Sequence, residues 1–291
     1  MIYKNLQFLQ NDLLSGLTSC ESIVSAYLSN IEESKHLNIY VEVFEQEATE
    51  KAKLLDQKIR SSPEQLGKLV GLVVSIKDVI CFEGHEVTAG SKILGGFKSS
   101  YSATAIQRLL DEDAIIIGRT NCDEFAMGSA NENSFYGPTI NGLGKNRVPG
   151  GSSGGSAVSV QMDTCMVALG SDTGGSVRQP AGFCGVIGFK PTYGRISRYG
   201  LIAYGSSFDQ IGLLAKDVSD IAKILECIAG PDDFDSTASD HEVPSYQEGL
   251  IETEPKRFAI LDVALNHPLL QPEVKSTTDS FIADLKSKGH T

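Results

Sequence analysis

Long apolar stretches are missing from this chain of 291 residues. No segment approaches the roughly 20 consecutive apolar residues that a membrane-spanning helix requires. The N-terminal letters MIYKNLQFLQNDLL also lack the basic and then apolar pattern of a secretory signal peptide. With 41% hydrophobic and 21% charged residues, the sequence predicts an ordinary globular protein located in the cytoplasm.

Closely spaced cysteines are also missing, because no C-x-x-C pair occurs anywhere in the sequence. The six cysteines are Cys20, Cys81, Cys122, Cys165, Cys184 and Cys227. Zinc knuckles and redox dithiols need short spacings, so we expect no metal site. Cysteines this far apart are expected to be small buried hydrophobic residues in a reducing compartment.

Positive charge is scarce relative to negative charge. The chain has 25 lysines and arginines against 37 aspartates and glutamates, which gives a formal net charge of -12. An acidic surface repels phosphates, so we do not expect this chain to bind nucleic acid alone. If its biology involves RNA, a partner should hold the RNA.

The first 64 residues are predicted to form a helical region packed on the core. Thr18 and Glu21 have the spacing of a capping box at the start of a helix. Its apolar face would carry Ile23, Val24, Tyr27, Leu28 and Ile31. A β-rich piece at 39–44 leads into a second helix that should end near Pro63. The apolar face of this helix would carry Ala48, Ala52, Leu55 and Ile59.

Residues 65–291 are predicted to form the core, in which strands alternate with helices. Strands are expected at 69–76, 114–118, 165–169 and 257–264, and helices at 103–112, 154–162, 217–229 and 273–288. This alternation indicates an α/β fold with a largely parallel or mixed central sheet flanked by helices. The chain stops after a strand, a helix and Gly289, where another strand is expected, so we expect the C-terminal part of the fold to be missing.

The most informative segment is GGSSGGSAVSVQMDTCMVALGSDTGGS at 150–176, in which two glycine-serine turns flank a helix and a strand. Glycine lets backbone N–H groups approach a bound oxygen without interference from a side chain. Such a turn can present a serine hydroxyl and an oxyanion hole together.

Three other interpretations of this segment are open. A phosphate-binding loop would need a G-K-[ST] ending, which is absent, and would follow its strand rather than precede it. A nucleophile elbow fits Gly150, Ser152 and Gly154 formally but needs a histidine base. The five histidines are His36, His85, His241, His267 and His290, and none has a distinctive setting. The third interpretation is two turns that only pack.

Lys77 gives the segment a possible base. It follows the apolar strand in the letters SIKDV, and burial of a lysine favours its neutral amine, which can accept a proton. The alternative is an ion pair with Asp78 or another carboxylate. The two serine turns downstream favour the base.

The pattern GGSSGG followed by a T-G-G-S turn resembles the amidase signature family, with the match running from about residue 65 to 215. The two serines lie 24 positions apart, which is the spacing that family shows. The resemblance implies the amidase signature fold, with Ser176 as the acylated nucleophile, Ser152 as the bridging serine and Lys77 as the base. It also implies an oxyanion hole formed by the backbone of Thr173, Gly174 and Gly175 with the Ser176 amide.

Residues 121–141 and 190–212 are closely similar to one branch of that family, which supplies ammonia to tRNA-dependent amidotransferases. This resemblance implies glutamine as substrate, an acyl-enzyme, and two partners, the B and C subunits of the amidotransferase. The B subunit would use ATP and magnesium and contact the tRNA, and this chain would bind no cofactor. A general amidase acting on small amides and an inactive scaffold are the alternatives.

Within that branch, Met127, Gly128 and Ser129 are expected to line the glutamine pocket, although FAMGS could instead simply pack against the sheet. Asp172 and Arg178 bracket the second turn and are expected to brace it. Members of the branch are considerably longer, and their glutamine-recognising charged residues lie in the C-terminal part. We therefore expect the 291-residue chain alone to show little glutaminase activity.

Overall fold

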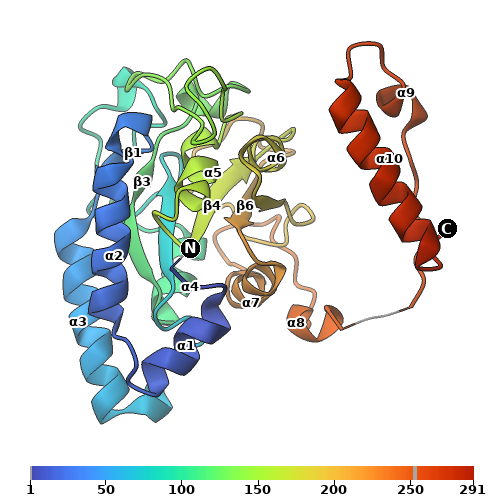
Figure 1. Ribbon diagram of the computed structural model, residues 1–291. Helices are drawn as coiled ribbons and strands as arrows, with labels where there is room; N and C mark the ends of the chain where they lie inside the picture. The colour runs from blue at the N-terminus through green and yellow to red at the C-terminus, as the bar shows by residue number, and fades with distance from the viewer. Residues whose placement is uncertain (1, 252–253) are drawn as a thin grey trace. The chain divides into compact units, whose positions relative to one another are not determined.

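The computed structural model describes residues 2–251 and 254–291, and the chain divides into two compact units, residues 1–247 and 248–291. Figure 1 shows the elements of both units. The boundary predicted between residues 64 and 65 stays a prediction. In the described ranges, no helix is long and apolar enough to span a membrane.

The first unit is built on a six-stranded sheet with the order β1-β3-β2-β4-β6-β5. The strands are β1 (Tyr40–Val43), β2 (Val73–Lys77), β3 (Ile115–Thr120), β4 (Val167–Asp172), β5 (Ile187–Phe189) and β6 (Gln210–Ala215). Strand β2 pairs in parallel with β3 and β4, whereas β1 on β3, β6 on β4 and β5 on β6 are antiparallel. The mixed α/β fold is therefore confirmed.

Helices surround this sheet, and α2 packs against α3 along one side of the unit (Figure 1). The helices are α1 (Leu6–Leu14), α2 (Cys20–Glu33), α3 (Glu45–Ser61), α4 (Thr104–Asp111), α5 (Gly154–Gln161), α6 (Arg178–Cys184) and α7 (Val218–Ile228). Short 3-10 helices are η1 (Lys35–Leu37), η2 (Pro63–Gln65), η3 (Lys92–Leu94) and η4 (Glu124–Ala126). Every predicted helix of this unit is confirmed.

The start of α2 differs from the prediction by one residue. Ser19, not Thr18, is the N-cap, and its side chain accepts a hydrogen bond from the N–H of Ser22. Glu21 does not complete a capping box, because it is the second residue after the cap and not the third. The Asp56 carboxylate of α3 accepts the backbone N–H groups of Cys20 and Glu21 at 2.7 and 3.1 Å. A residue of another helix thus accepts an N–H group at the start of α2 that the sequence pattern assigned to the nearby Thr18 side chain.

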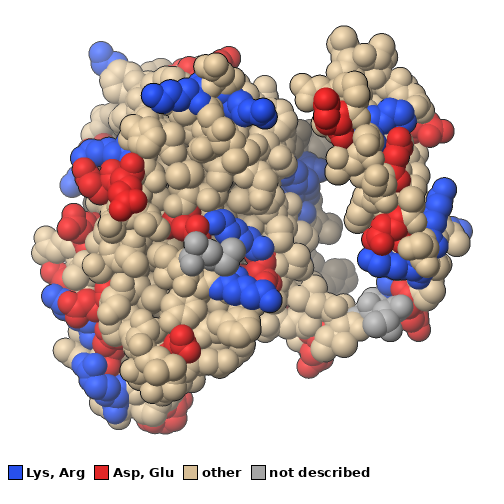
Figure 2. Space-filling view, viewed as in Figure 1, with Lys and Arg blue, Asp and Glu red and all other residues tan. Residues whose placement is uncertain are grey.

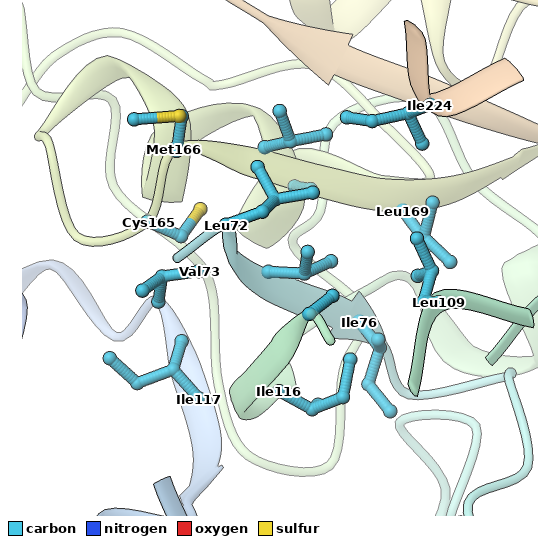
Figure 3. Packing of buried hydrophobic residues seen from close by; sticks show 14 of the residues in the cluster. Leu72, Val73, Ile76, Leu109, Ile116, Ile117, Cys165, Met166, Leu169 and Ile224 are labelled. Carbon is cyan, nitrogen blue, oxygen red and sulfur yellow. The ribbon is translucent and has the colours of Figure 1, made fainter. Parts of the chain in front are cut away.

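The core lies where the parallel strands meet the helices. Strands β2, β3 and β4 are buried along their whole length, as their apolar sequences predict. Figure 3 shows Leu72, Val73 and Ile76 among side chains from neighbouring elements. Five of the six cysteines are buried, and Cys227 is partly buried, so their predicted role as small core residues is confirmed.

The predicted strands of this unit have bounds that differ from the predicted ones, and β5 and β6 were not predicted. The strand expected at 69–76 begins only at Val73, and β4 extends to Asp172, which brings this carboxylate to the end of the sheet. Strand β5 has only three residues, and β6 has Gln210 and Gly212 in its first half, so neither sequence gives a clear strand signal by periodicity alone.

The second unit contains α9 (Asp262–Leu265) and α10 (Pro272–Ser287), and the short α8 (Tyr246–Gly249) lies at the boundary. The helix predicted at 273–288 is confirmed, but the strand predicted at 257–264 is wrong. A strand needs a neighbour, and in the described part of this unit the segment pairs only with Thr291, which accepts from Phe258 N at 2.6 Å. Every described residue of this second unit is exposed or partly exposed, so its described part has no buried core.

Candidate active site

Lys77 is the last residue of β2, and its side chain is fully buried. Its Nζ lies 2.6 Å from Ser152 Oγ, 2.9 Å from Ser171 Oγ and 3.5 Å from the Ser171 carbonyl oxygen. The parallel pairing of β2 with β4 places Ser171 next to the end of β2. The amine therefore has only neutral hydrogen-bonding partners in the described chain.

Burial dominates the electrostatics of this amine. Burial lowers the pKa of Lys77 from 10.5 to about 8, although the Cys122 thiol and the carboxylates of Asp123, Asp172 and Asp209 act in the opposite direction. An amine with a pKa near 8 is partly deprotonated at neutral pH. It can then accept a proton from the Ser152 hydroxyl.

The ion pair considered between Lys77 and Asp78 is not formed. The Asp78 carboxylate binds the Arg119 guanidinium and accepts the backbone N–H groups of Thr88 and Gly90, each at 2.8 Å. Asp78 lies just beyond the end of β2, and these contacts give its carboxylate an environment separate from that of Lys77. The ion-pair interpretation of Lys77 is therefore wrong.

Ser152 lies in the first glycine-serine turn, immediately before α5, and is fully buried. Its carbonyl oxygen accepts the N–H of Asp123 at 3.2 Å. A Cβ at Gly151 would lie 2.0 Å from Asp123 Oδ2, so only glycine fits at this position. The Gly151–Ser152 peptide is cis.

Asp172 organises the second glycine-serine turn. Its carboxylate accepts the N–H groups of Gly175 and Val177 at 2.7 and 3.1 Å and binds Arg178 through two side-chain bonds of 3.0 Å. Burial works against the charge, but the hydrogen bonds from Arg178 and Gly175 hold the pKa of Asp172 below its usual value. The bracing role predicted for Asp172 and Arg178 is confirmed.

The two turns meet through their backbones, because Ser153 N donates to the Ser176 carbonyl oxygen at 3.1 Å. Ser176 is partly exposed, and within the described residues its hydroxyl makes no hydrogen bond. The predicted relay thus has its first link, from Lys77 to Ser152, while the second link to Ser176 is not a hydrogen bond in this state. The catalytic roles of the three residues stay a prediction.

The predicted oxyanion donors differ in their availability. The Gly175 N–H is engaged with Asp172, whereas the N–H groups of Gly174 and Ser176 have no hydrogen-bond partner in the described part of the chain. The Thr173 hydroxyl donates to Asp209 at 2.5 Å and fixes the start of the turn. Two free donors close to a serine hydroxyl could hold an oxyanion.

The structure brings Met127, Gly128 and Ser129 next to the first turn. All three are exposed, and Met127 keeps 52% of its surface accessible, so packing against the sheet does not account for it. A Cβ at Gly128 would lie 2.3 Å from Asp123 Cγ. The Ser129 carbonyl accepts the side-chain amide of Gln179 at 2.9 Å, which ties this loop to α6.

The other interpretations of the glycine-serine segment do not fit. Ser152 Oγ is hydrogen-bonded to Lys77 and, among the described residues, to no histidine, which excludes the nucleophile elbow with a histidine base. In the first turn, the N–H groups of Gly151, Ser153 and Gly155 already bond to protein oxygens, so they are not free to bind a phosphate. Within residues 2–251 and 254–291, no group of three or more His, Cys, Asp or Glu residues could hold a metal ion.

Sequence reasoning missed three residues of this site: Ser171, Asp123 and Gln179. Asp123 and Ser171 stand within segments already singled out, at 121–141 and 150–176, but their types alone do not mark them. Each acts through contacts with residues far away in the sequence, which only the strand order reveals.

Comparisons with known proteins agree with this geometry. Residues 22–291 match the amidase family. The chain is 56% identical, over 85% of its length, to the A subunit of glutamyl-tRNA(Gln) amidotransferase from Chlorobaculum parvum, and the match covers 51% of that protein.

Two solved structures are similar over most of the chain. The A subunit of glutamyl-tRNA(Gln) amidotransferase from Thermotoga maritima has a TM-score of 0.67 and 40% identity, covering 77% of this chain and 46% of that one. The native peptide amidase of Stenotrophomonas maltophilia has a TM-score of 0.89 and 28% identity, covering 99% and 61%. The chain spans about half the length of the curated relatives from Chlorobaculum.

Proposed function

The chain belongs to the amidase family, and we propose that it is the glutaminase part of the A subunit of a glutamyl-tRNA(Gln) amidotransferase. The observation that carries the proposal is the 2.6 Å contact between Lys77 Nζ and Ser152 Oγ in a fully buried setting. A buried amine without a carboxylate partner can serve as a base, and the adjacent hydroxyl can pass the proton on.

The mechanism follows from this arrangement. Neutral Lys77 accepts a proton from Ser152, Ser152 accepts one from Ser176, and Ser176 Oγ attacks the carboxamide carbon of glutamine. The free N–H groups of Gly174 and Ser176, together with that of Thr173, would hold the oxyanion. The relay returns a proton to the leaving nitrogen, ammonia departs, and water hydrolyses the acyl-enzyme. In this proposal Met127, Gly128 and Ser129 line the glutamine pocket.

The ammonia would serve an ATP-dependent carbon-nitrogen ligase that converts Glu-tRNA(Gln) to Gln-tRNA(Gln) in the cytoplasm. The B and C subunits of that ligase would be the partners, with ATP and magnesium used by the B subunit and no cofactor bound here. The names of the relatives support this assignment, and the net charge of -12 favours a partner as the main tRNA contact. On the face of the first unit drawn in Figure 2, basic side chains are interspersed with acidic ones.

The test measures ammonia release from glutamine by the protein assembled with its partner subunits. We expect activity that Ser176→Ala abolishes and that alanine at each of the five histidines leaves intact. Greater activity on acetamide-like compounds than on glutamine would instead indicate a general amidase, which the similarity to the peptide amidase favours. Failure of every amide and ester to acylate Ser176, judged by intact mass, would indicate an inactive scaffold.

A further inference from the structure

Gln179 has a side chain that contacts two segments of the site at once. It lies in the first turn of α6, three residues after Ser176. Its Oε1 accepts the Gly151 N–H at 2.9 Å, and its Nε2 donates to the Ser129 carbonyl at 2.9 Å. Its own backbone N–H donates to the Gly175 carbonyl at 2.8 Å. One residue therefore joins three segments: the second glycine-serine turn, which carries Ser176, the first glycine-serine turn, which carries Ser152, and the exposed loop at 127–129.

The Gly151 contact controls the position of Ser152. The Gly151 N–H belongs to the planar peptide group that joins Gly150 to Gly151, so this hydrogen bond fixes the backbone that leads directly into Ser152 and thereby limits where the Ser152 hydroxyl can lie. The proposed proton relay requires Ser152 Oγ to stay within hydrogen-bonding distance of Lys77 Nζ, and the two atoms lie 2.6 Å apart. The carboxamide offers an acceptor to one segment and a donor to the other, whereas a carboxylate would lack the donor and an alkyl chain would lack both.

We propose that Gln179 is a positioning residue. It holds Ser152 and the 127–129 loop in a fixed position relative to the turn that carries Ser176. This inference rests on the proposed function, because it concerns the reactivity of Ser176. Gln179 touches no reacting atom in this mechanism. It acts through Gly151 and Ser129.

Gln161 offers a matched control, because it makes the same two kinds of contact at the other end of α6. Its Oε1 accepts the Gly142 N–H at 2.9 Å, and its Nε2 donates to the Cys184 carbonyl at 2.9 Å and to Asn141 Oδ1 at 3.1 Å. Both glutamines are partly buried. Gln161 contacts neither glycine-serine turn, so loss of its amide removes similar bonds without moving the site.

The experiment measures the rate at which phenylmethanesulfonyl fluoride labels Ser176 in the 291-residue chain, by intact mass. The reagent transfers its sulfonyl group to Ser176 Oγ, while fluoride leaves and the hydroxyl proton enters the relay. We expect Gln179→Met to slow labelling by about 10- to 100-fold at every pH, because a serine displaced by a fraction of an ångström is misaligned. Gln161→Met should label at close to the wild-type rate. Thermal stability should fall to a similar extent in both variants.

Three outcomes contradict the inference. If both variants slow labelling equally, or if neither does, Gln179 has only a structural role and the proposed function stands. If Gln179→Met shifts the pH midpoint of labelling rather than its plateau, the residue acts on Lys77 rather than on position. If the unaltered chain is not labelled at Ser176 while its fold is intact, the proposed function fails and the inference with it.

Discussion

The Ser171 hydroxyl lies 2.9 Å from Lys77 Nζ and gives the buried amine a second neutral partner besides Ser152. Neither partner favours the charged form of the lysine as an adjacent carboxylate would. The next residue, Asp172, points to the other side of β4 and organises the nucleophile turn. Two consecutive residues at the end of one strand thus contact Lys77 and the turn that carries Ser176 separately.

The first prediction concerns the pH dependence of Ser176 reactivity. Lys77 must be neutral to accept a proton, and its pKa is lowered to about 8 by burial. Labelling of Ser176 and glutaminase activity should therefore rise with pH through about 8 and level off above it. Measurement of either rate from about pH 6 to about pH 9.5 tests this, and a midpoint near the ordinary histidine value of about 6.5 would contradict it.

The second prediction concerns stability. Folding lowers the pKa of Lys77 from 10.5 to about 8, so between these values the unfolded chain binds more protons than the folded one. Stability contributed by this group therefore increases as pH rises through that window. Relative to Lys77→Met, the wild type should gain up to about 3 kcal/mol of unfolding free energy between pH 8 and 10.5.

Urea unfolding of both proteins at the two ends of the window checks this second prediction. The same substitution at the exposed Lys145 is the control, since that side chain stays in water in both states. A difference between wild type and Lys77→Met that does not change with pH would show that the amine is not desolvated on folding.

The sequence predicted α2, α3, α4, α5 and α7 and the parallel centre of the sheet because local signals determine them, whereas α1 and α6 were not predicted. Residues 114–118 form a continuous apolar run, and α7 begins after the cap Asp217, so neither needs tertiary information. The segment 257–264 is also largely apolar, yet it is not a strand, because a strand exists only with a neighbour. Thr18 is not the cap of α2, because Ser19 accepts the Ser22 N–H and Asp56 of α3 accepts the Glu21 N–H.

The site could be predicted only in part for the same reason. Lys77 and Ser152 were paired across 75 positions through a motif and a buried strand, and their contact is present. Ser171 and Gln179 carry no motif of their own. Their roles depend on β4 lying beside β2 and on α6 lying over the first turn, which the pattern of residues does not reveal.

The third prediction compares Asp172 and Arg178, whose ion pair braces the turn that carries Ser176. Asn at position 172 offers one carbonyl oxygen where the carboxylate accepts the N–H groups of Gly175, Val177 and Arg178. Asp172→Asn should therefore lower the Ser176 labelling rate by about 100-fold, the effect expected when a preorganised donor is lost. Arg178→Lys should be milder, because the Arg178 side chain is 52% exposed and water can replace part of its contact. Equal losses in the two variants would contradict this order.

The fourth prediction uses a buried carboxyl far from the chemistry. Asp220 of α7 accepts the Leu6 N–H at 2.9 Å, and burial, with the nearby charge of Asp217, raises the pKa of Asp220 from 3.8 to about 6. The folded state thus binds more protons than the unfolded state between these values, so this group costs stability as pH rises through them. Asparagine keeps an acceptor for Leu6 without a charge. Asp220→Asn should increase the free energy of unfolding by roughly 1 to 3 kcal/mol at about pH 8 and have little effect near pH 4.

Asp217, which caps the same helix, is the matched control for this fourth prediction. Burial works against its charge too, but hydrogen bonds from the Ser219 hydroxyl and N–H hold the pKa of Asp217 below its usual value. Its stabilisation is present at neutral pH and is lost as pH falls through the folded pKa, so Asp217→Asn should destabilise at about pH 8. Urea unfolding of both variants at that pH should therefore give changes of opposite sign. If Asp220→Asn destabilises as Asp217→Asn does, the hydrogen bond to Leu6 requires the charge, and the cost of burial is smaller than the benefit of that bond.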